Sequence, residues 1–303
     1  NLQYKDNVKT DQALPSNPPV KIAISLLRKD KIKTCLSLFV LYIVNIFDYK
    51  DTVKTKLSLR KTHDVKTNKS LHELYNIKRG VVKMGKILLV VSDKGGVGKS
   101  TYVANTGSML VNKGKSVIIL KTDKNHDLLS WNEKRTDNGL LTIPVHAAYG
   151  NVSNEIKRLS KLCEVLIVDC PGHDSQEFRS ALTVSDIVVT LVKPSSDFES
   201  ETLTSVTEKI RTAQKANAAL EPWVLFTRIN SAKPRHRKAA IDLDKLLRSD
   251  NIWIQPLKTR ISELDVYESA CNEGAGVHDV SRASSLSTAK AQIELVAQEI
   301  GIL

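Results

Sequence analysis

The run Lys94-Gly95-Gly96-Val97-Gly98-Lys99-Ser100-Thr101 has the residue types and spacing of a phosphate-binding loop. Glycines let consecutive backbone N–H groups turn toward an anion, because no side chain blocks its approach. Lys99 is placed to contact β- and γ-phosphates, Ser100 to bind Mg²⁺, and Thr101 to lie near the α-phosphate. The run also follows an apolar stretch and opens a helical pattern, as such loops do. It predicts a nucleoside triphosphate site.

A carboxylate ends another apolar run, at residues 164–169. Asp169 would stand at the carboxyl end of this strand, where it could hold a Mg²⁺-bound water. The same pattern also fits a plain buried strand that is closed by an aspartate.

Apolar runs that resemble strands alternate with helical patterns from residue 86 onward. The expected strands are 86–92, 116–120, 141–146, 164–169, 187–192, 223–227 and 253–257. The expected helices are 99–111, 152–162, 176–184, 199–216, 234–249 and 283–300. This alternation predicts an α/β fold with a doubly wound, mostly parallel sheet flanked by helices. Ligands bind such sheets at the carboxyl ends of the strands.

The positive charge of the chain is concentrated before this region. The whole chain has a net charge of +12, of which residues 1–83 contribute +10 and residues 84–303 only +2. The first 83 residues also lack a sustained amphipathic period. We therefore expect two parts, a basic N-terminal segment at 1–83 and a nucleotide-binding domain at 84–303.

The basic segment has two interpretations. Met84 is the first methionine, so residues 1–83 could be upstream sequence read in frame, without structure of their own. Alternatively, they form a basic arm that binds DNA or acidic lipid. The apolar run at 35–47 has 13 residues, fewer than the roughly 18 to 20 that a membrane-spanning helix needs.

Four cysteines occur without C-x-x-C spacing, so the sequence indicates neither a zinc site nor a disulfide framework. A reducing cytoplasm is the expected compartment.

Lys94 makes the glycine-rich run a match to K-G-G-x-G-K-[ST], and the sequence here resembles the deviant Walker A motif of the ParA/MinD superfamily. The resemblance covers residues 84–299. It implies a P-loop NTPase fold of the SIMIBI type, Mg²⁺-dependent ATP hydrolysis, and a homodimer in which Lys94 crosses to the partner's nucleotide. Without the resemblance, Lys94 is an exposed lysine at the end of a strand.

The resemblance also assigns a role to Asp123. This residue matches the Walker A′ aspartate, which positions the attacking water by orientation and electrostatics. The family usually has D-x-D-P-Q at this point, whereas this chain has Lys121-Thr122-Asp123-Lys124-Asn125. The first carboxylate is thus replaced by a lysine, which predicts slow or differently regulated hydrolysis. The presence of Trp131 eight residues after Asp123 is a further similarity to the ParF-like plasmid partition proteins.

The base-binding residues are also suggested by this resemblance. The guanine-reading pattern N-K-x-D does not follow the run at 223–227, and the chain has Thr227-Arg228 there, as ParF-like proteins do. The segment 194–198 nearly matches their P-S-x-x-D-F pattern. We therefore expect ATP, with Pro194, Asp197 and Arg228 near the base.

Basic residues gather in the C-terminal half, where residues 209–260 have a net charge of +8. The candidates for non-specific contacts to DNA phosphates are Lys233, Arg235, Arg237, Lys238, Lys258 and Arg260. A solvated helix face accounts for the same residues.

The resemblance implies a DNA partition ATPase in the cytoplasm, associated with the nucleoid. ATP would join two subunits, the dimer would bind DNA, and a ParB-like centromere-binding adaptor would stimulate hydrolysis. Two alternatives stay open, a MinD-like membrane-cycling regulator and a metabolic or reductase ATPase. We expect no membrane contact, because the pattern at 283–300 lacks the cationic face of a membrane-surface helix.

Overall fold

The computed structural model describes residues 84–92, 94–124, 127–171, 174–194 and 199–303. The basic segment at 1–83 lies outside these residues, so the predicted boundary after residue 83 stays a prediction.

A six-stranded parallel sheet with strand order β3-β2-β4-β1-β5-β6 forms the centre of the described chain. Its strands are β1 (Lys86–Ser92), β2 (Val117–Lys121), β3 (Val145–Ala147), β4 (Val165–Pro171), β5 (Ile187–Val192) and β6 (Glu221–Phe226). The chain moves toward β3 after β1 and toward β6 after β4. The direction therefore reverses between these two neighbouring strands, and at such a switch point doubly wound sheets bind ligands. The predicted fold class is confirmed.

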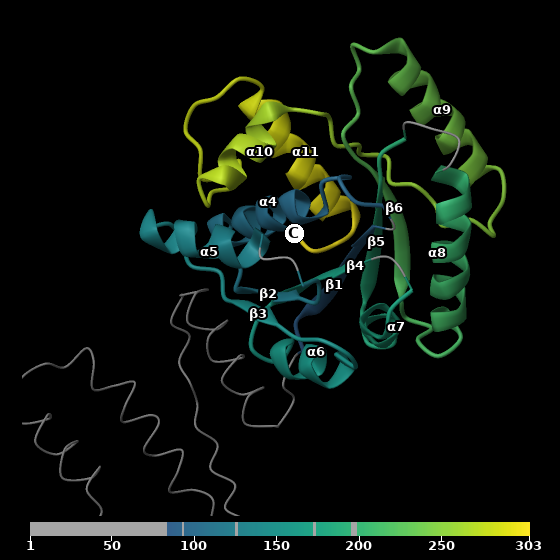
Figure 1. Cartoon of the computed structure of the whole chain (residues 1–303), viewed down its shortest axis with the longest axis horizontal. Coiled ribbons are helices and arrows are strands. Elements are labelled where there is room, and N and C mark those ends of the chain that lie inside the picture. Colours follow the sequence, from purple (N-terminus) through teal and green to yellow (C-terminus); the bar gives the residue numbers. More distant parts are fainter. Residues whose placement is uncertain (1–83, 93, 125–126, 172–173, 195–198) are drawn as a thin grey trace, which may run out of the picture. The chain divides into compact units, whose positions relative to one another are not determined.

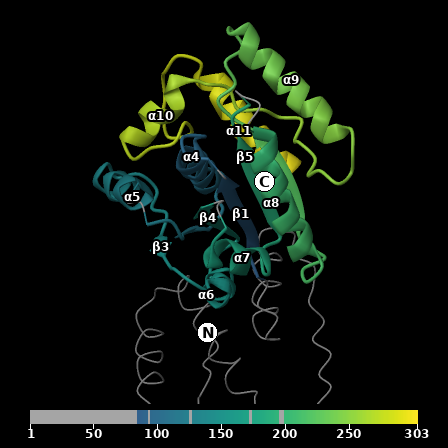
Figure 2. The same cartoon turned by 45° about the vertical axis from the view of Figure 1, so that its right-hand side comes forward.

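Helices cover both faces of the sheet (Figures 1 and 2). The layer on one face consists of α4 (Lys99–Asn112), α5 (Asp127–Asp137), α10 (Asp265–Asn272) and α11 (Leu286–Glu299). The opposite layer consists of α6 (Ser153–Leu159), α7 (Gln176–Leu182), α8 (Glu199–Gln214) and α9 (Pro234–Arg248).

The strand β1 lies in the middle and is buried on both sides. Its odd-numbered residues, such as Leu89, pack against the α6–α9 layer, while Leu88 and Val90 pack against the α4 layer. A strand buried on both faces is apolar throughout and does not alternate, which explains the run ILLVV in its interior.

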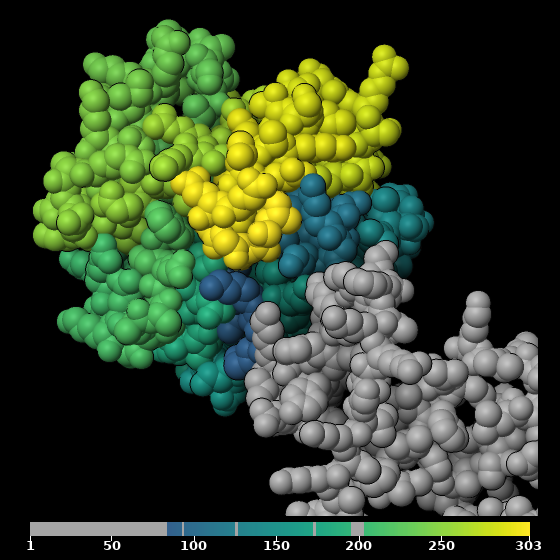
Figure 3. Space-filling model, turned by 180° about the vertical axis from the view of Figure 1, so that it is seen from behind, coloured from purple at the N-terminus to yellow at the C-terminus, as the bar shows by residue number. Residues whose placement is uncertain are grey.

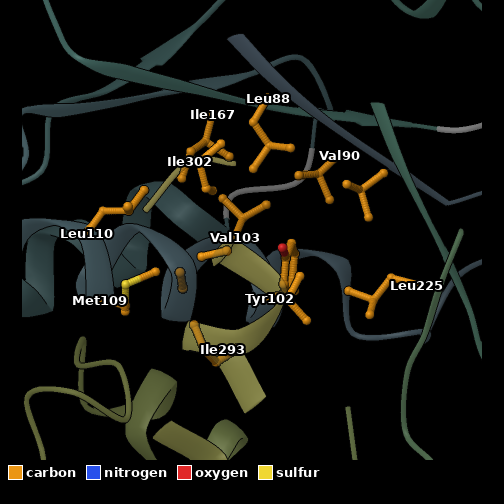
Figure 4. Packing of buried hydrophobic residues seen from close by; sticks show 14 of the residues in the cluster. Leu88, Val90, Tyr102, Val103, Met109, Leu110, Ile167, Leu225, Ile293 and Ile302 are labelled. Carbon is orange, nitrogen blue, oxygen red and sulfur yellow. The ribbon is translucent and has the colours of Figure 1, made fainter. Parts of the chain in front are cut away.

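The helix α4 packs between the sheet and α11. Figure 4 shows Tyr102 and Val103 of α4 among Leu88 and Val90 of β1, with Ile293 of α11 close by. Nine consecutive residues of α4 are buried, so this helix is enclosed on nearly all sides. Its first turn, where the glycine-rich run ends, is consequently held in a fixed position above the sheet.

The C-terminal residues lie beside the start of β1, as the view from behind shows (Figure 3). Gly301, Ile302 and Leu303 line the same groove as Met84 and Lys86. Ile302 is buried and belongs to the core under α4. This groove lies at the amino ends of the strands, opposite the edge where ligands are expected.

The expected strand at 253–257 is wrong. Within the described residues this segment makes only an isolated parallel bridge, Val224 to Pro256, with hydrogen bonds from Val224 N to Gln255 O and from Leu257 N to Val224 O. The ladder does not continue, because the N–H of Thr259 donates to the carboxylate of Glu299 and the next hydrogen bond to the Phe226 carbonyl comes from Ile261.

Other boundaries shift by a few residues. The strand expected at 141–146 is shortened to β3, which lies at the sheet edge with its last two residues exposed. The helix α5 was not among the expected helices. Its apolar positions are few, with only Leu128, Trp131 and Arg135 buried, so no long apolar stripe marks it in the sequence.

Candidate nucleotide-binding site

The glycine-rich run forms the connection from β1 to α4, as expected. Gly96 and Gly98 have φ angles of 76° and 91°, which non-glycine residues rarely adopt. A Cβ placed on Gly95 or Gly96 would meet no atom of the described residues within 4 Å, so this part of the loop borders open space among them. Val97 is buried and anchors the loop. The loop thus offers backbone N–H groups and a helix N-terminus to a ligand.

Lys99 and Asp169 are brought together by α4 and β4. The Lys99 ammonium donates to a carboxylate oxygen of Asp169, and the two side chains are 11% and 2% exposed. Burial raises the pKa of Asp169 above its ordinary value, and the positive charge of Lys99 opposes that rise. Because Asp169 lies on the strand beside β1, the predicted phosphate and metal residues share one site.

Asp123 follows β2 at the same edge of the sheet and is partly exposed. Its neighbour Thr122 fixes the start of this loop, since the backbone N–H and the hydroxyl of Thr122 both donate to the carbonyl oxygen of Asp169, at 2.9 and 3.1 Å. Lys121 donates to the backbone carbonyl of Asp123. Residues 121–123 are therefore hydrogen-bonded to β4 and lie beside Asp169.

The end of β6 holds the loop from the other side. The hydroxyl of Thr227 donates to the carbonyl oxygen of Val97 at 2.8 Å, and Nη1 of Arg228 donates to that of Gly96 at 3.2 Å. Arg228 also forms ion pairs with Glu263 and Glu268, at 3.8 and 3.0 Å. It adopts a positive φ of 54°, a conformation uncommon for a residue other than glycine.

A pocket lies between this strand end and α4. Among its lining residues are Gly98, Thr101, Tyr102, Arg228, Leu264 and Tyr267. It adjoins the first turn of α4, so a base could enter it from a nucleotide whose phosphates lie on the loop. The placement of Arg228 is compatible with the predicted base contact. Pro194 is buried after β5 and is not one of the residues that line this pocket, and Asp197 lies outside the described residues.

The predicted phosphate and Mg²⁺ residues fit their ligands chemically. Open space above Gly95 and Gly96 leaves room for an anion, and Lys99 supplies a positive charge beside it. Ser100 lies in the first turn of α4, and a hydroxyl and a carboxylate are oxygen ligands of the kind that Mg²⁺ prefers. Lys94 lies partly exposed in the loop, and its reach to a second subunit stays a prediction.

The basic candidates lie mainly at the start of α9. Lys233 caps this helix, and Arg235, Arg237 and Lys238 are exposed on its first turns. Lys258 is also exposed. Arg260 has structural partners, because its guanidinium pairs with Asp244 at 3.3 Å and lies over the Phe226 ring at 5.5 Å. Their contact with DNA stays a prediction.

Sequence reasoning missed Thr227 as a structural partner of the loop and treated Lys121 only as a departure from a pattern. Nothing in the sequence indicates that a threonine after an apolar run donates a hydrogen bond to the glycine-rich loop, 130 positions earlier. Lys121 offered a signal, because a lysine directly after four apolar residues in a central strand is uncommon.

Comparisons with known proteins match this domain to a nucleotide-binding family. A family model described as the CobQ/CobB/MinD/ParA nucleotide binding domain matches residues 88–264. The ParA protein of Rhizobium radiobacter is 24% identical over 218 residues, which cover 71% of this chain and 95% of that protein.

Two solved structures show the same fold. A variant of McdA from Cyanothece, in complex with ATP, is 16% identical with a TM-score of 0.54, covering 73% of this chain and 98% of that chain. The septum site-determining protein MinD from Pyrococcus horikoshii, complexed with Mg-ADP, is 20% identical with a TM-score of 0.53, covering 72% and 98%.

Proposed function

Because the family model matches more than half of its residues, the chain belongs to the CobQ/CobB/MinD/ParA nucleotide-binding family, and we propose that it is an ATPase that segregates DNA. The observation that carries the proposal is the joint placement of the glycine-rich loop, Lys99 and Asp169 at the switch point of the sheet. The ParA relative, matched over 95% of its length, supports partition rather than another family role.

Each residue of the site would have a distinct task. The loop N–H groups and Lys99 would hold the ATP phosphates, and Ser100 and Asp169 would hold Mg²⁺, directly and through water. Mg²⁺ would screen the phosphate charge. Asp123 would orient the attacking water, for which its position beside Asp169 is suitable.

Dimerisation would complete the site. Lys94 lies partly exposed in the loop, from which a long side chain can reach a second subunit. ATP would then join two copies of the chain, and hydrolysis would separate them. A ParB-like adaptor would stimulate hydrolysis and so set the lifetime of the dimer.

The exposed N-terminal end of α9 would bind DNA. Arg235 and Lys238 are exposed near the start of this helix, and neither forms an ion pair among the described contacts. Lysine and arginine suit contacts to DNA phosphates, which carry no sequence information.

A membrane-cycling role is less well supported. The polar residues of α11 bind the protein body. Glu299 accepts hydrogen bonds from the backbone N–H groups of Lys258 and Thr259 at 2.6 and 3.1 Å. Glu294 forms an ion pair with Lys113 at 2.9 Å. A helix with these contacts is not poised to leave for a lipid surface. Within the described part of the chain, we find no helix with the length and apolar character to cross a membrane.

An iron-sulfur or reductase role is also less well supported. Cys170 follows Asp169 directly, but it is fully buried, and burial raises the pKa of its thiol to about 12. A protonated, enclosed thiol is a poor metal ligand, because the thiolate is the binding form.

A gel shift with non-specific duplex DNA tests the proposal. The protein should bind DNA with ATP and Mg²⁺ but not with ADP or without nucleotide, and Lys99→Ala should remove both nucleotide binding and the shift. Arg235→Ala with Lys238→Ala should weaken DNA binding and lower the salt dependence by about one to two released ions, while ATP binding stays unchanged.

Lys157→Ala with Arg158→Ala, on the exposed face of α6, is the matched control and should leave the shift intact. ATP binding without any ATP-dependent shift would remove the DNA role and leave the nucleotide site standing.

A further inference from the structure

Lys121 is a buried lysine on the strand next to Asp169, at one side of the proposed ATP site. It ends β2 and is 2% exposed, although lysine is rarely buried to this extent. It pairs in register with Asp169 on the neighbouring strand. In a parallel sheet, residues in register project to the same side. Lys121 and Asp169 thus belong to one face of the sheet edge.

The surroundings of Lys121 are a compact set of charges. Its ammonium donates to the backbone carbonyl of Asp123. Burial lowers the pKa of Lys121, whereas the carboxylates of Asp123, Asp169 and Asp127 oppose this shift and Lys99 adds to it. Lys121 therefore interacts electrostatically with Asp169, which would hold Mg²⁺, and with Asp123, which would orient the attacking water.

The lysine changes the charge balance of the site. Lys99 and Lys121 together match the charges of Asp123 and Asp169. With a carboxylate at position 121, as in the D-x-D pattern, the same four positions would carry a net charge of −2. A divalent cation is attracted by such an excess and is repelled by a fixed ammonium beside one of its ligands.

We propose that Lys121 is a positioning residue that acts as a built-in cation, holding the Asp123 segment and making nucleotide binding only weakly dependent on Mg²⁺. The inference rests on the proposed ATP site and adds to it. In a site with the D-x-D pattern, Mg²⁺ screens the phosphate charge. In this chain, the ammonium of Lys121 beside Asp169 balances part of that charge. Mg²⁺ is then needed mainly for turnover.

Calorimetric titration of the full chain with ATP, in excess EDTA over residual metal and again in saturating MgCl₂, tests the inference. For the wild-type protein, we expect the two dissociation constants to differ by less than about fivefold. Lys121→Gln keeps a hydrogen-bond donor but removes the charge. Its dissociation constant without Mg²⁺ should rise by about tenfold or more, while its value with Mg²⁺ changes much less.

Two variants separate charge from position. Lys121→Arg keeps the charge and should keep the weak Mg²⁺ dependence. Lys115→Gln removes a lysine that precedes the same strand at the far end of the sheet, where it pairs with Glu164 at 3.6 Å, and should behave as wild type.

The outcomes distinguish the two proposals. Equal Mg²⁺ dependence in wild type and Lys121→Gln would overturn the role of Lys121 while the ATP site stands. A wild-type protein that binds ATP at least a hundredfold more weakly in EDTA overturns it too, whether or not the glutamine variant folds. No heat with ATP under either condition would instead remove the ATP site, and this inference with it.

Discussion

Arg135 on α5 and Asp279 after α10 form a buried ion pair with two hydrogen bonds, at 2.6 and 3.2 Å, between residues 144 positions apart in the chain. Asp279 also accepts hydrogen bonds from Ser108 and Asn112 of α4, at 2.7 and 2.8 Å, and from the N–H of Gly276 at 2.8 Å. One carboxylate thus joins α4 and α5 to the segment before α11. The helix that follows the Asp123 loop is consequently fixed to the helix that begins at the glycine-rich loop.

Asp279→Asn should destabilise the protein by about 3 kcal/mol, because it leaves Arg135 buried without its counter-charge. Burial opposes the ionisation of Asp279, but hydrogen bonds from Arg135, Gly276, Ser108 and Asn112 outweigh it and lower its pKa to about 2. Urea unfolding at neutral pH measures the loss.

The same pair predicts an acid dependence of stability. A folded-state pKa of about 2 lies below the ordinary value of 3.8, so the carboxylate stabilises the fold above pH 3.8 and this contribution is lost as the pH falls through 2. The asparagine variant should lack this component between pH 4 and pH 2. Glu155→Gln, in an exposed pair with Arg158, should leave the unfolding midpoint unchanged. An Asp279→Asn variant as stable as wild type would show that the ion pair of Arg135 with Asp279 is dispensable.

Gly274→Ala should be far more harmful than Gly301→Ala, although both glycines have a φ of 71°. A Cβ on Gly274 would lie 2.4 Å from the backbone nitrogen of Arg135, whereas one on Gly301 would meet no atom within 4 Å in the part of the chain that the structure describes. We expect about 1 kcal/mol for the backbone strain alone in Gly301→Ala, and several times this for Gly274→Ala. Thermal melts of the two variants give the comparison, and equal melting temperatures would contradict the close packing of α5 on this turn.

Thr227→Val should weaken ATP binding, because it removes the donor to the carbonyl of Val97 and loosens the phosphate-binding loop. The lost hydrogen bond should cost about 1 to 2 kcal/mol of stability. Thr190→Val on β5 is the matched control, since the Thr190 hydroxyl is buried and has no hydrogen-bond partner among the described residues. The control should be neutral or stabilising. If both variants bind ATP like wild type, the hydrogen bond from Thr227 does not support the loop.

The local parts of the site could be predicted from the sequence, and the long-range parts could not. The loop at 94–101 and the strand ending near Asp169 are short segments whose composition specifies their conformation, so both were found where expected. The ion pair of Arg135 with Asp279 depends on two side chains that look like solvated surface charges in the sequence. The missing strand at 253–257 reflects a long-range contact, because the N–H groups of Lys258 and Thr259 donate to the carboxylate of Glu299 instead of extending the ladder.

Lys121 lies between these two cases. The sequence shows that a lysine replaces an expected carboxylate, but a strand-end lysine can also extend into solvent. Only the packing of β2 against β4 and the loop shows that this one is buried and bonded to Asp123.

Asp123→Ala should retain ATP binding, lose turnover and accumulate the dimer. The alanine keeps the backbone carbonyl to which Lys121 donates, so the loop should hold its position while the carboxylate proposed to orient water is gone. If the proposed role of Asp123 in orienting water holds, turnover should fall by about a hundredfold or more. Phosphate release measures this, and light scattering with ATP measures the dimer. Asp137→Ala, at the exposed end of α5, is the matched control and should turn over ATP like wild type. Unchanged turnover in the Asp123 variant would exclude its carboxylate from hydrolysis, and an unaltered monomer content would separate dimer lifetime from that step.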